Sequence, residues 1–403
     1  MSDPVVQKRL RIEALSSLHV GSGERLRRKD LAKRGDQLFV VDSRKLLECI
    51  GTNPRLSEAF LAFCEDEQKD LSNFLTESHI RFEDVRSYQI TAPRRVGREI
   101  FTFIKTIDGF PFLPGSSIKG ALRSAILQYA FLSQGSLLNK VGQDVREKLG
   151  ELQNELERNP KTRDHIIKKW KQKILEVIEQ SFFGPDQHHD LMRCIQIADS
   201  QPVDVARLQV AEVKVLSTSG SRLMIKQTRA GLDMVINPEV IRKGTPFVCP
   251  LSFHMNLLSD REPSRRLKFH PKSDTILDFP ATCHEVAERL IQQEITFYRK
   301  YGQKELTSWY LELERQLAQL KPNQCLLRVA WGSGFDPKTA TDLFGDELFD
   351  EIRWAFNLGK FERDQQGKRR LIKPFPKSRK IIFENDKAKE PLGWVKLTIE
   401  EES

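Results

Sequence analysis

The sequence predicts an α+β fold made of two modules. Strand and helix candidates are interleaved along 403 residues, a length that fits two domains better than one. The best local pairing signal is Asp108-Gly109, a two-residue turn between extended segments that is typical of an antiparallel hairpin. Antiparallel pairing favours α+β over a doubly wound parallel sheet. Two glycine-rich segments, one in each half, indicate two related modules.

The first half begins with a half-buried strand over residues 8–18. Leu10, Ile12 and Ala14 alternate there with charged residues, and a glycine-broken turn follows at 19–24. The other candidates of this half are a strand at 37–42, helices at 43–50 and 53–78, an extended segment at 88–105, a return strand at 110–113, a helix at 118–132, a charged helical stretch at 136–180 and a strand at 194–198.

The second half repeats the mixture of strands and helices. Its candidates are strands at 210–216, 247–257 and 326–331, a helical stretch at 282–320, and a C-terminal hairpin with strands at 379–383 and 394–399 around a loop at 385–393. We interpret the helical stretches at 136–180 and 282–320 as insertions packed on the scaffold.

Composition indicates a folded protein with an anionic partner. Hydrophobic residues make up 39% and charged residues 30%, enough to bury a core. The net charge is +9 and the pI about 9.1, which favours nucleic acid or an anionic membrane, although a basic surface also serves solubility alone. No apolar run could span a bilayer and the N-terminus lacks an apolar signal core. We therefore expect a cytoplasmic protein without a membrane partner.

The cysteines give no sign of a metal or disulfide framework. The six cysteines are widely scattered and no C-x-x-C pair occurs. A zinc site normally includes a close ligand pair, and cytosolic thiols stay reduced. We expect buried or incidental thiols, no bound metal and no cofactor.

The segment from Phe112 to Arg123 has the features of an anion site. It reads Phe-Leu-Pro-Gly-Ser-Ser-Ile-Lys-Gly-Ala-Leu-Arg, a strand, a sharp turn and a helix. Ser116 and Ser117 are good N-cap residues, so the free N–H groups of the first helical turn are expected to point outward. The G-x-x-x-x-G-K order of nucleotide loops is absent, which favours an RNA backbone over a mononucleotide.

Four positions in this segment suit contact with a phosphate backbone. Gly115 and Gly120 would let a phosphate approach the main chain, and Lys119 and Arg123 lie four residues apart on one helical face. Alternatively, the segment is an ordinary capped helix with a solvated cationic face.

Basic and aromatic residues are interleaved just upstream. The cations are Arg94, Arg95, Arg98 and Lys105, and the aromatics are Phe101, Phe103, Phe110 and Phe112. Bases stack on exposed aromatic rings while cations follow the phosphates. Alternating phenylalanines on a strand are usually core, and we expect at least half of these four to be buried.

At this point a family resemblance is visible. The segment 112–123 resembles the P-G-S-S-x-K-G-x-x-R signature of the RAMP superfamily, the backbone proteins of type III CRISPR effectors. Other segments that resemble the family are Leu18–Gly23 (L-H-x-G-S-G), Phe182–Pro185 with Ile195–Asp199, Trp331–Phe335 and Pro391–Leu397. Their order and the chain length most resemble the subunit-five family of the type III-A (Csm) complex.

The resemblance implies two ferredoxin-like (RRM-like) modules, over residues 1–200 and 201–403, each with one of the helical insertions. It also implies a non-catalytic subunit that binds CRISPR RNA, caps the 3′ side of the guide, and supports complex assembly and guide maturation in antiviral defence. Target RNA and the other subunits of the effector are the further partners. The residues expected to contact RNA are His19, Gly21, Ser22, Gly23, Arg94, Arg95, Arg98, Gly115, Ser116, Ser117, Lys119, Gly120, Arg123, Gly332, Ser333 and Gly334.

Catalytic residues are hard to assign from the sequence. Asp30 is flanked by cations and has no obvious carboxylate partner, although related filament subunits that cut target RNA carry an aspartate in a comparable loop. His188-His189 with Asp186 and Asp190 is the densest metal-like cluster, and Asp199 reads as a turn former. The alternatives to a non-catalytic RNA-binding subunit are a metal-dependent 3′–5′ exoribonuclease that trims the guide and a pure assembly adaptor.

Overall fold

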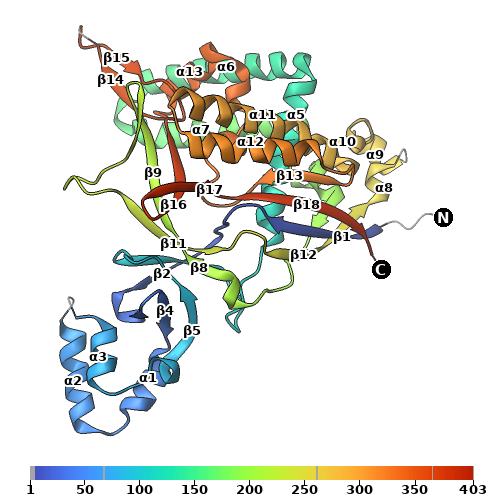
Figure 1. Cartoon of the computed structure of the whole chain (residues 1–403). Coiled ribbons are helices and arrows are strands. Elements are labelled where there is room, and N and C mark those ends of the chain that lie inside the picture. The colour runs from blue at the N-terminus through green and yellow to red at the C-terminus, as the bar shows by residue number, and fades with distance from the viewer. Residues whose placement is uncertain (1–4, 67–68, 260–261, 365, 403) are drawn as a thin grey trace.

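The computed structural model describes residues 5–66, 69–259, 262–364 and 366–402. These residues form two large sheets, a covering of helices and a separate two-stranded hairpin (Figure 1). The predicted mixture of helices and antiparallel strands is confirmed. None of the described helices is long and apolar enough to cross a membrane.

The smaller sheet has five strands and is antiparallel throughout. In spatial order its strands are β13 (Gln324–Arg328), β18 (Trp394–Glu401), β1 (Val5–Ala14), β12 (Pro246–His254) and β7 (Ile195–Ile197). The alternation predicted for the first strand is confirmed, because Leu10, Ile12 and Ala14 are buried while Arg11 is exposed. These three residues lie on one face of β1, which is the central strand of the sheet and packs on the core.

Helices cover this sheet in two layers (Figure 1). The inner helices are α5 (Gly115–Ser133), α11 (Phe279–Lys300) and α12 (Lys304–Ala318), and the outer ones are α6 (Gly135–Arg158), α7 (Arg163–Phe183) and α13 (Asp346–Ala355). The two predicted helical stretches are confirmed as helical, and each is a pair of helices with its apolar positions buried, such as Trp170, Ile174 and Ile178 of α7.

One ferredoxin-like strand order is present, and it spans the chain. In sequence, α5 lies between β1 and β7, and α11 lies between β12 and β18, so the order β18-β1-β12-β7 is that of a βαββαβ unit. The larger sheet does not repeat this order, and the prediction of two such modules is not confirmed. Both sheets take strands from either side of residue 200, and the division at that residue stays a prediction.

The larger sheet has eleven strands and curves away from the smaller one. Its main path is β17 (Lys387–Pro391), β16 (Ser378–Glu384), β9 (Glu212–Ser219), β11 (Val235–Ile241), β8 (Leu208–Val210), β5 (Arg86–Thr91), β4 (Gln37–Val41) and β3 (Leu31–Arg34). The strands β10 (Arg222–Ile225), β6 (Glu99–Phe103) and β2 (Gly21–Arg27) branch from it: β10 pairs with β9, β6 with β11, and β2 with β6.

A small lobe with its own core lies at the end of the larger sheet (Figure 1). Its helices are α1 (Ser43–Ile50), α2 (Pro54–Glu65), α3 (Leu71–Glu77) and α4 (Phe82–Val85). Phe39, Phe63, Phe74 and Phe82 fill the space between them and β4. The single helix predicted over 53–78 is wrong, because α2 ends at Glu65 and α3 begins at Leu71; residues 67 and 68 lie outside the described residues.

Both predicted hairpins pair differently in the structure. The Asp108-Gly109 turn forms, but residues 110–113 make only a single bridge, from Pro111 to Lys105, and β6 pairs instead with β2 and β11. At the C-terminus, β16 turns at Asn385-Asp386 into β17, which occupies the predicted loop, while β18 lies in the other sheet. Both turn residues have positive φ, which asparagine and aspartate tolerate better than most side chains.

Candidate nucleic-acid interface

The two predicted glycine-rich segments lie side by side. The N–H of Trp331 donates to the carbonyl of His19 over 3.1 Å, although the two residues belong to opposite ends of the chain. A third segment joins them, since Gly393 N–H donates to Ser17 O (3.1 Å) and Gly393 O accepts from Val329 N–H (2.7 Å). A Cβ on Gly393 would lie 2.3 Å from Val329 O, so this junction requires glycine.

His19 holds the junction together from inside. Its side chain is buried, its Nδ1 lies 2.6 Å from the carbonyl of Glu239, and its ring meets Trp331 edge-on with centroids 5.5 Å apart. Burial lowers the pKa of His19, which favours the neutral imidazole. An Nδ1–H that donates to the carbonyl leaves Nε2 as the acceptor, and Nε2 faces Gly21, where a Cβ would approach it to 3.1 Å. In this structure His19 is a packing residue beneath the glycine turn.

The turn of Gly21, Ser22 and Gly23 is exposed at the start of β2. Ser22 Oγ lies 2.5 Å from Thr102 Oγ1, which ties the turn to the neighbouring strand β6. The strand β2 carries the surface from this turn to Arg27. Because Gly21 pairs with Phe103 and Arg27 with Glu99, the two ends lie about 14 Å apart, at about 3.4 Å for each of the four steps along β6.

Three exposed arginines lie beyond the far end of β2. Arg94, Arg95 and Arg98 sit in the loop between β5 and β6, and Arg98 directly precedes the pairing of Glu99 with Arg27. The loop backbone is held by Lys33, whose Nζ donates to the carbonyls of residues 93 and 94 over 2.6 and 2.7 Å. Among the described residues the three guanidinium groups form no ion pair. They are therefore free cations on a fixed loop.

The second glycine-rich segment exposes less than predicted. Ser333 is fully buried and its hydroxyl donates to Ala330 O over 2.8 Å. Gly332 is also buried, at φ +86°, against Leu392. Only Gly334, at φ +98°, lies exposed with open space around it. Direct contact of RNA with Ser333 would need the loop to change conformation.

Two lysines that the sequence reasoning missed lie near this loop. Lys380 of β16 places its Nζ 5.0 Å from the centre of the Trp331 ring. Burial lowers the pKa of Lys338, and the positive charges of Lys380 and Arg328 lower it further, which indicates that these cations lie close together. Nothing in the local sequence links β16 to Trp331, because the contact depends on how the sheet is assembled.

The start of α5 is closed by the protein's own carboxylate. The helix begins at Gly115 with Pro114 as its cap, one turn earlier than predicted, and Gly115 N–H donates to Asp199 Oδ1 over 2.8 Å. Asp199 therefore satisfies one of the N–H groups predicted to point at an anion. Ser116 and Gly120 are exposed and Ser117 is half-buried, so these three positions remain at the surface.

The two cations of α5 are both engaged within the chain. Lys119 Nζ donates to Ile195 O over 2.8 Å, and burial lowers its pKa. Arg123 pairs with Asp190 (2.7 Å) and Glu179 (2.9 Å) and lies 3.9 Å from the ring centre of Phe183. In the free chain, these side chains fasten α5 to β7 and α7.

The upstream aromatics are mostly not core, contrary to prediction. Only Phe103 is buried; Phe110 is 44% exposed, and Phe101 and Phe112 are half-buried. Lys105 is not a free cation, because its Nζ lies 2.5 Å from Glu239 Oε2.

Glu239 is a fully buried carboxylate that fixes the strands around the interface. Besides Lys105, it accepts from Tyr88 Oη (2.6 Å) and from Phe103 N–H (2.7 Å). Burial raises the pKa of Tyr88, so its phenol remains a donor. This network joins β5, β6 and β11 directly beneath His19.

The candidate catalytic residues have structural partners. Asp30 Oδ2 accepts from Arg27 N–H over 2.7 Å, and Asp186 pairs with His189 Nδ1 at 2.8 Å. Within the described ranges, no group of three or more histidine, cysteine or acidic side chains could hold a metal ion. All six cysteines are free thiols, four of them buried.

Comparison with known proteins identifies a family. The model of the RAMP superfamily matches residues 11–372. The chain is 23% identical to the CRISPR system Cms protein Csm5 of Methanocaldococcus jannaschii, over 97% of this chain and 89% of that protein. Proteins of the same name from Streptococcus thermophilus (25% identical) and Mycobacterium tuberculosis (26%) match 50% and 52% of this chain, and 53% and 59% of their own lengths.

Two solved structures share the fold. One is a chain from the cryo-EM structure of a Csm–crRNA–target RNA ternary complex of a type III-A CRISPR–Cas system, with a TM-score of 0.66, 22% identity, and coverage of 97% of this chain and 100% of that one. The other is the crystal structure of T. onnurineus Csm5, with a TM-score of 0.59, 20% identity and coverage of 96% and 99%.

Proposed function

The chain belongs to the RAMP superfamily, and on that premise we propose that it is a non-catalytic, RNA-binding subunit of a type III-A CRISPR effector that caps the 3′ end of the guide RNA. Its partners are then CRISPR RNA, target RNA and the other effector subunits. Assembly of the complex and maturation of the guide depend on it. The division into modules at residue 200 belongs to the same proposal.

The junction of the two glycine-rich segments carries this proposal. The Trp331–His19 hydrogen bond brings an exposed glycine turn, an aromatic ring and Lys380 to one surface. From there β2 leads to Arg94, Arg95 and Arg98, whose charges no carboxylate of the described residues neutralises. An extended surface with free cations and an aromatic ring suits a single strand, which is held by phosphate contacts and base stacking.

The proposal assigns two different roles to the predicted contact residues. Gly21–Gly23, the three arginines, Ser116, Ser117, Gly120 and Gly334 are exposed or half-exposed and would face RNA. His19, Gly115, Lys119, Arg123, Gly332 and Ser333 have partners inside the chain and would shape the surface from beneath.

The salt dependence of RNA binding tests the arginine loop. Replacing Arg94, Arg95 and Arg98 by alanine should flatten the slope of log Kd against log salt by up to about two units, at about 0.7 per phosphate contact on a single strand. The matched control is a second triple variant, Lys161→Ala, Lys168→Ala and Lys171→Ala, which removes the same charge from an exposed segment on α7 and before it. Equal slopes for the two triples would refute the interface.

Capping is tested in the reconstituted effector. With the chain present, a 3′–5′ exonuclease should stop at a defined guide end; without it, trimming should proceed further. A guide end that does not depend on the chain would refute capping. Incubation of the purified chain with RNA and Mg²⁺ or Mn²⁺ should leave the RNA intact, and shortening that EDTA stops would instead identify the trimming exoribonuclease.

A further inference from the structure

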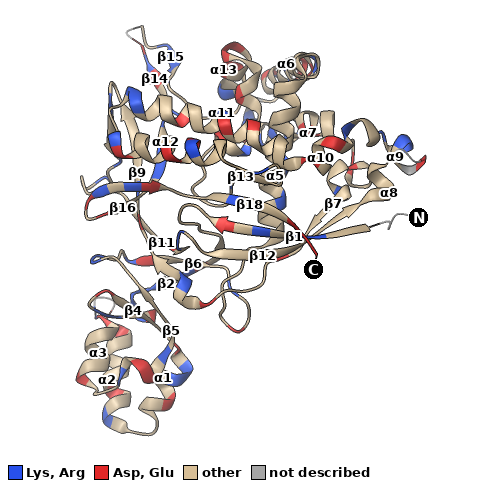
Figure 2. Cartoon of the chain, turned by 45° about the vertical axis from the view of Figure 1, so that its right-hand side comes forward, with Lys and Arg blue, Asp and Glu red and all other residues tan. Residues whose placement is uncertain are grey.

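A basic hairpin projects from the body of the molecule. Its strands, β14 (Phe361–Arg363) and β15 (Arg369–Leu371), pair only with each other and stand clear of both large sheets (Figures 1 and 2). Residues 360–373 contain six lysines and arginines against two carboxylates, and all six cations are exposed. We call residues 360–364 and 366–373 the basic arm.

An aromatic platform fastens the arm to α13. Trp354, at the end of that helix, is 43% exposed, and its ring centre lies 4.9 Å from that of Phe361. The guanidinium of Arg369 lies 4.2 Å from the Phe361 ring and 5.7 Å from the Trp354 ring. A two-stranded hairpin is marginally stable alone, so these contacts set the direction of the arm. Part of the indole remains open to solvent beside the cations.

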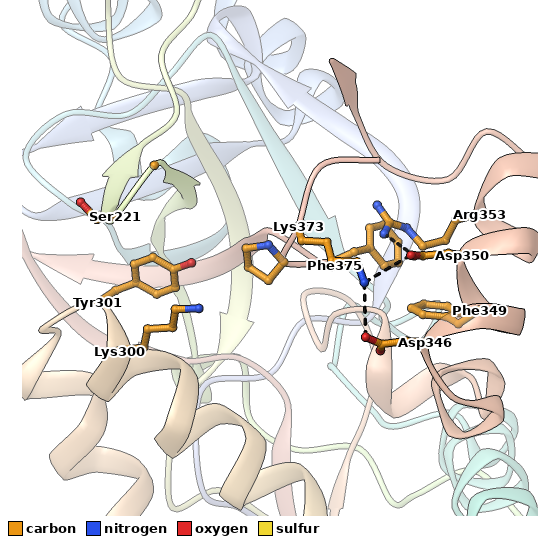
Figure 3. A pocket seen from close by; sticks show the side chains of 11 residues that line it. Ser221, Lys300, Tyr301, Asp346, Phe349, Asp350, Arg353, Lys373 and Phe375 are labelled. Atoms are coloured by element: carbon orange, nitrogen blue, oxygen red, sulfur yellow. Dashed lines mark hydrogen bonds and ion pairs between the residues drawn. The ribbon is translucent and has the colours of Figure 1, made fainter. Parts of the chain in front are cut away.

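A cavity of about 470 Å³ opens at the base of the arm (Figure 3). Its walls include the aromatic rings of Tyr301 at the end of α11, Phe349 of α13, and Phe375 just after the arm. Two carboxylates, Asp346 and Asp350, face the same space, and Lys373 of the arm reaches both over 3.3 Å. The cavity and the arm therefore share a residue and form one continuous surface.

The chemistry of this surface distinguishes between anionic partners. A polyanion suits the arm. In the cavity, Asp346 and Asp350 lie beside Lys300, Lys373 and Arg353. Each carboxylate can still accept further hydrogen bonds, for which the acidic side chains of a peptide offer no donor. RNA suits both parts of the surface. Its phosphates can contact the cations of the arm, and the amino groups of its bases can donate to the carboxylates of the cavity. Aromatic walls suit an unstacked base, which can stack on them.

We propose that the basic arm and the cavity at its base form a second binding surface for single-stranded RNA, in which the arm holds phosphates and the cavity holds one base that bears an amino group. This inference rests on the proposed RNA-binding function and extends it to a region that none of the predicted contact residues includes. Bases with an exocyclic amine should be preferred over uracil.

Binding of the full-length chain to labelled RNA tests the arm. Lys360 and Lys368 form no ion pair with the other described residues, so Lys360→Gln with Lys368→Gln removes two charges without breaking a contact. The salt slope should fall by up to about 1.4 units, whereas the control Lys168→Gln with Lys171→Gln on α7 should leave it unchanged. Trp354→Ala should weaken binding about tenfold if a base stacks there.

The cavity is tested by base preference. Oligocytidylate should bind about three- to tenfold more tightly than oligouridylate, the ratio expected for one added hydrogen bond. Replacing Asp346 and Asp350 by alanine should abolish that ratio, which is independent of any overall change in affinity. If the variant does not fold, two measurements on the unmodified chain still test the cavity: the base ratio, and a cross-link from 6-thioguanosine RNA, whose base keeps an amino group, to Tyr301 or Phe375.

The failures of the two proposals are distinguishable. If the arm and control variants behave alike and the base ratio is near one, while the arginine-loop triple still lowers the slope, only the second surface is refuted. If polyglutamate displaces RNA from the arm as well as competing RNA does at equal charge, the arm binds acidic chains and the inference is also wrong. If the chain binds no RNA, both proposals fail.

Discussion

Two glycines of one motif should respond oppositely to the same substitution. Gly115 and Gly120 lie five residues apart in α5. A Cβ on Gly115 would lie 2.1 Å from Ile197 O and 2.6 Å from Ala198 O, both backbone atoms. A Cβ on Gly120 would meet nothing within 4 Å. Alanine at the first position must push α5 away from β7, whereas at the second it only improves helix propensity.

The magnitudes follow from these contacts. Overpacking against backbone costs about 1–3 kcal/mol, and moving Gly115 also loosens its hydrogen bond to the Asp199 carboxylate, worth about 1.5–3 kcal/mol. Gly115→Ala should therefore destabilise the fold by about 3–5 kcal/mol. Gly120→Ala should stabilise it by about 0.5–1 kcal/mol. With an unfolding entropy of about 2.1 cal/mol/K per residue, each kcal/mol shifts the Tm of this chain by about 1 °C.

Differential scanning calorimetry measures the Tm of the two variants, and an RNA-binding titration is the second measurement. If an RNA backbone passes over the exposed start of α5, Gly120→Ala should bind RNA more weakly although it is more stable. A Gly115→Ala variant with the Tm of the unmodified chain would refute the steric argument. A loss of stability in Gly120→Ala would refute the assignment of that glycine to function.

Three further predictions concern the buried charges and the glycine junction. Burial raises the pKa of Asp336 to about 6, above its usual 3.8, so the folded state binds the extra proton between these values. Relative to Asp336→Asn, the free energy of unfolding should fall by about 2 kcal/mol as pH rises from 4 to 6 and become level above pH 7, as measured by urea titration at each pH. Arg123→Lys keeps the charge but loses the separate contacts of Nη1 with Asp190 and of Nε and Nη2 with Glu179. It should lower stability by about 1–2 kcal/mol while leaving the RNA salt slope unchanged; a flatter slope would show that Arg123 reaches RNA. Gly393→Ala would place a methyl 2.3 Å from Val329 O at φ +89°, and should lower the Tm by several degrees and weaken RNA binding through the displaced junction; an unchanged Tm would contradict this.

The sequence by itself determined the features that depend on neighbours along the chain. The alternation of Leu10, Ile12 and Ala14 identified a strand with one buried face, and the helical spacing in 136–180 and 282–320 identified the helices. The glycine-rich and P-G-S-S motifs identified the superfamily. Such signals are readable because burial repeats with the period of the element that the residues form.

Only the tertiary structure decided which distant segments meet. It placed β18 beside β1 rather than beside β16, put the Asp199 carboxylate on the first N–H of α5, and brought His19, Trp331 and Lys380 together. It also showed that Lys119 and Arg123, which the sequence predicts as exposed cations, bind to other parts of the chain. Periodicity reports whether a side chain is buried but not which side chain covers it, because that partner is chosen by packing between segments hundreds of residues apart. The start of α5 is thus predictable as a helix from its residues, while its accessibility to an anion depends on a strand that arrives from elsewhere in the chain.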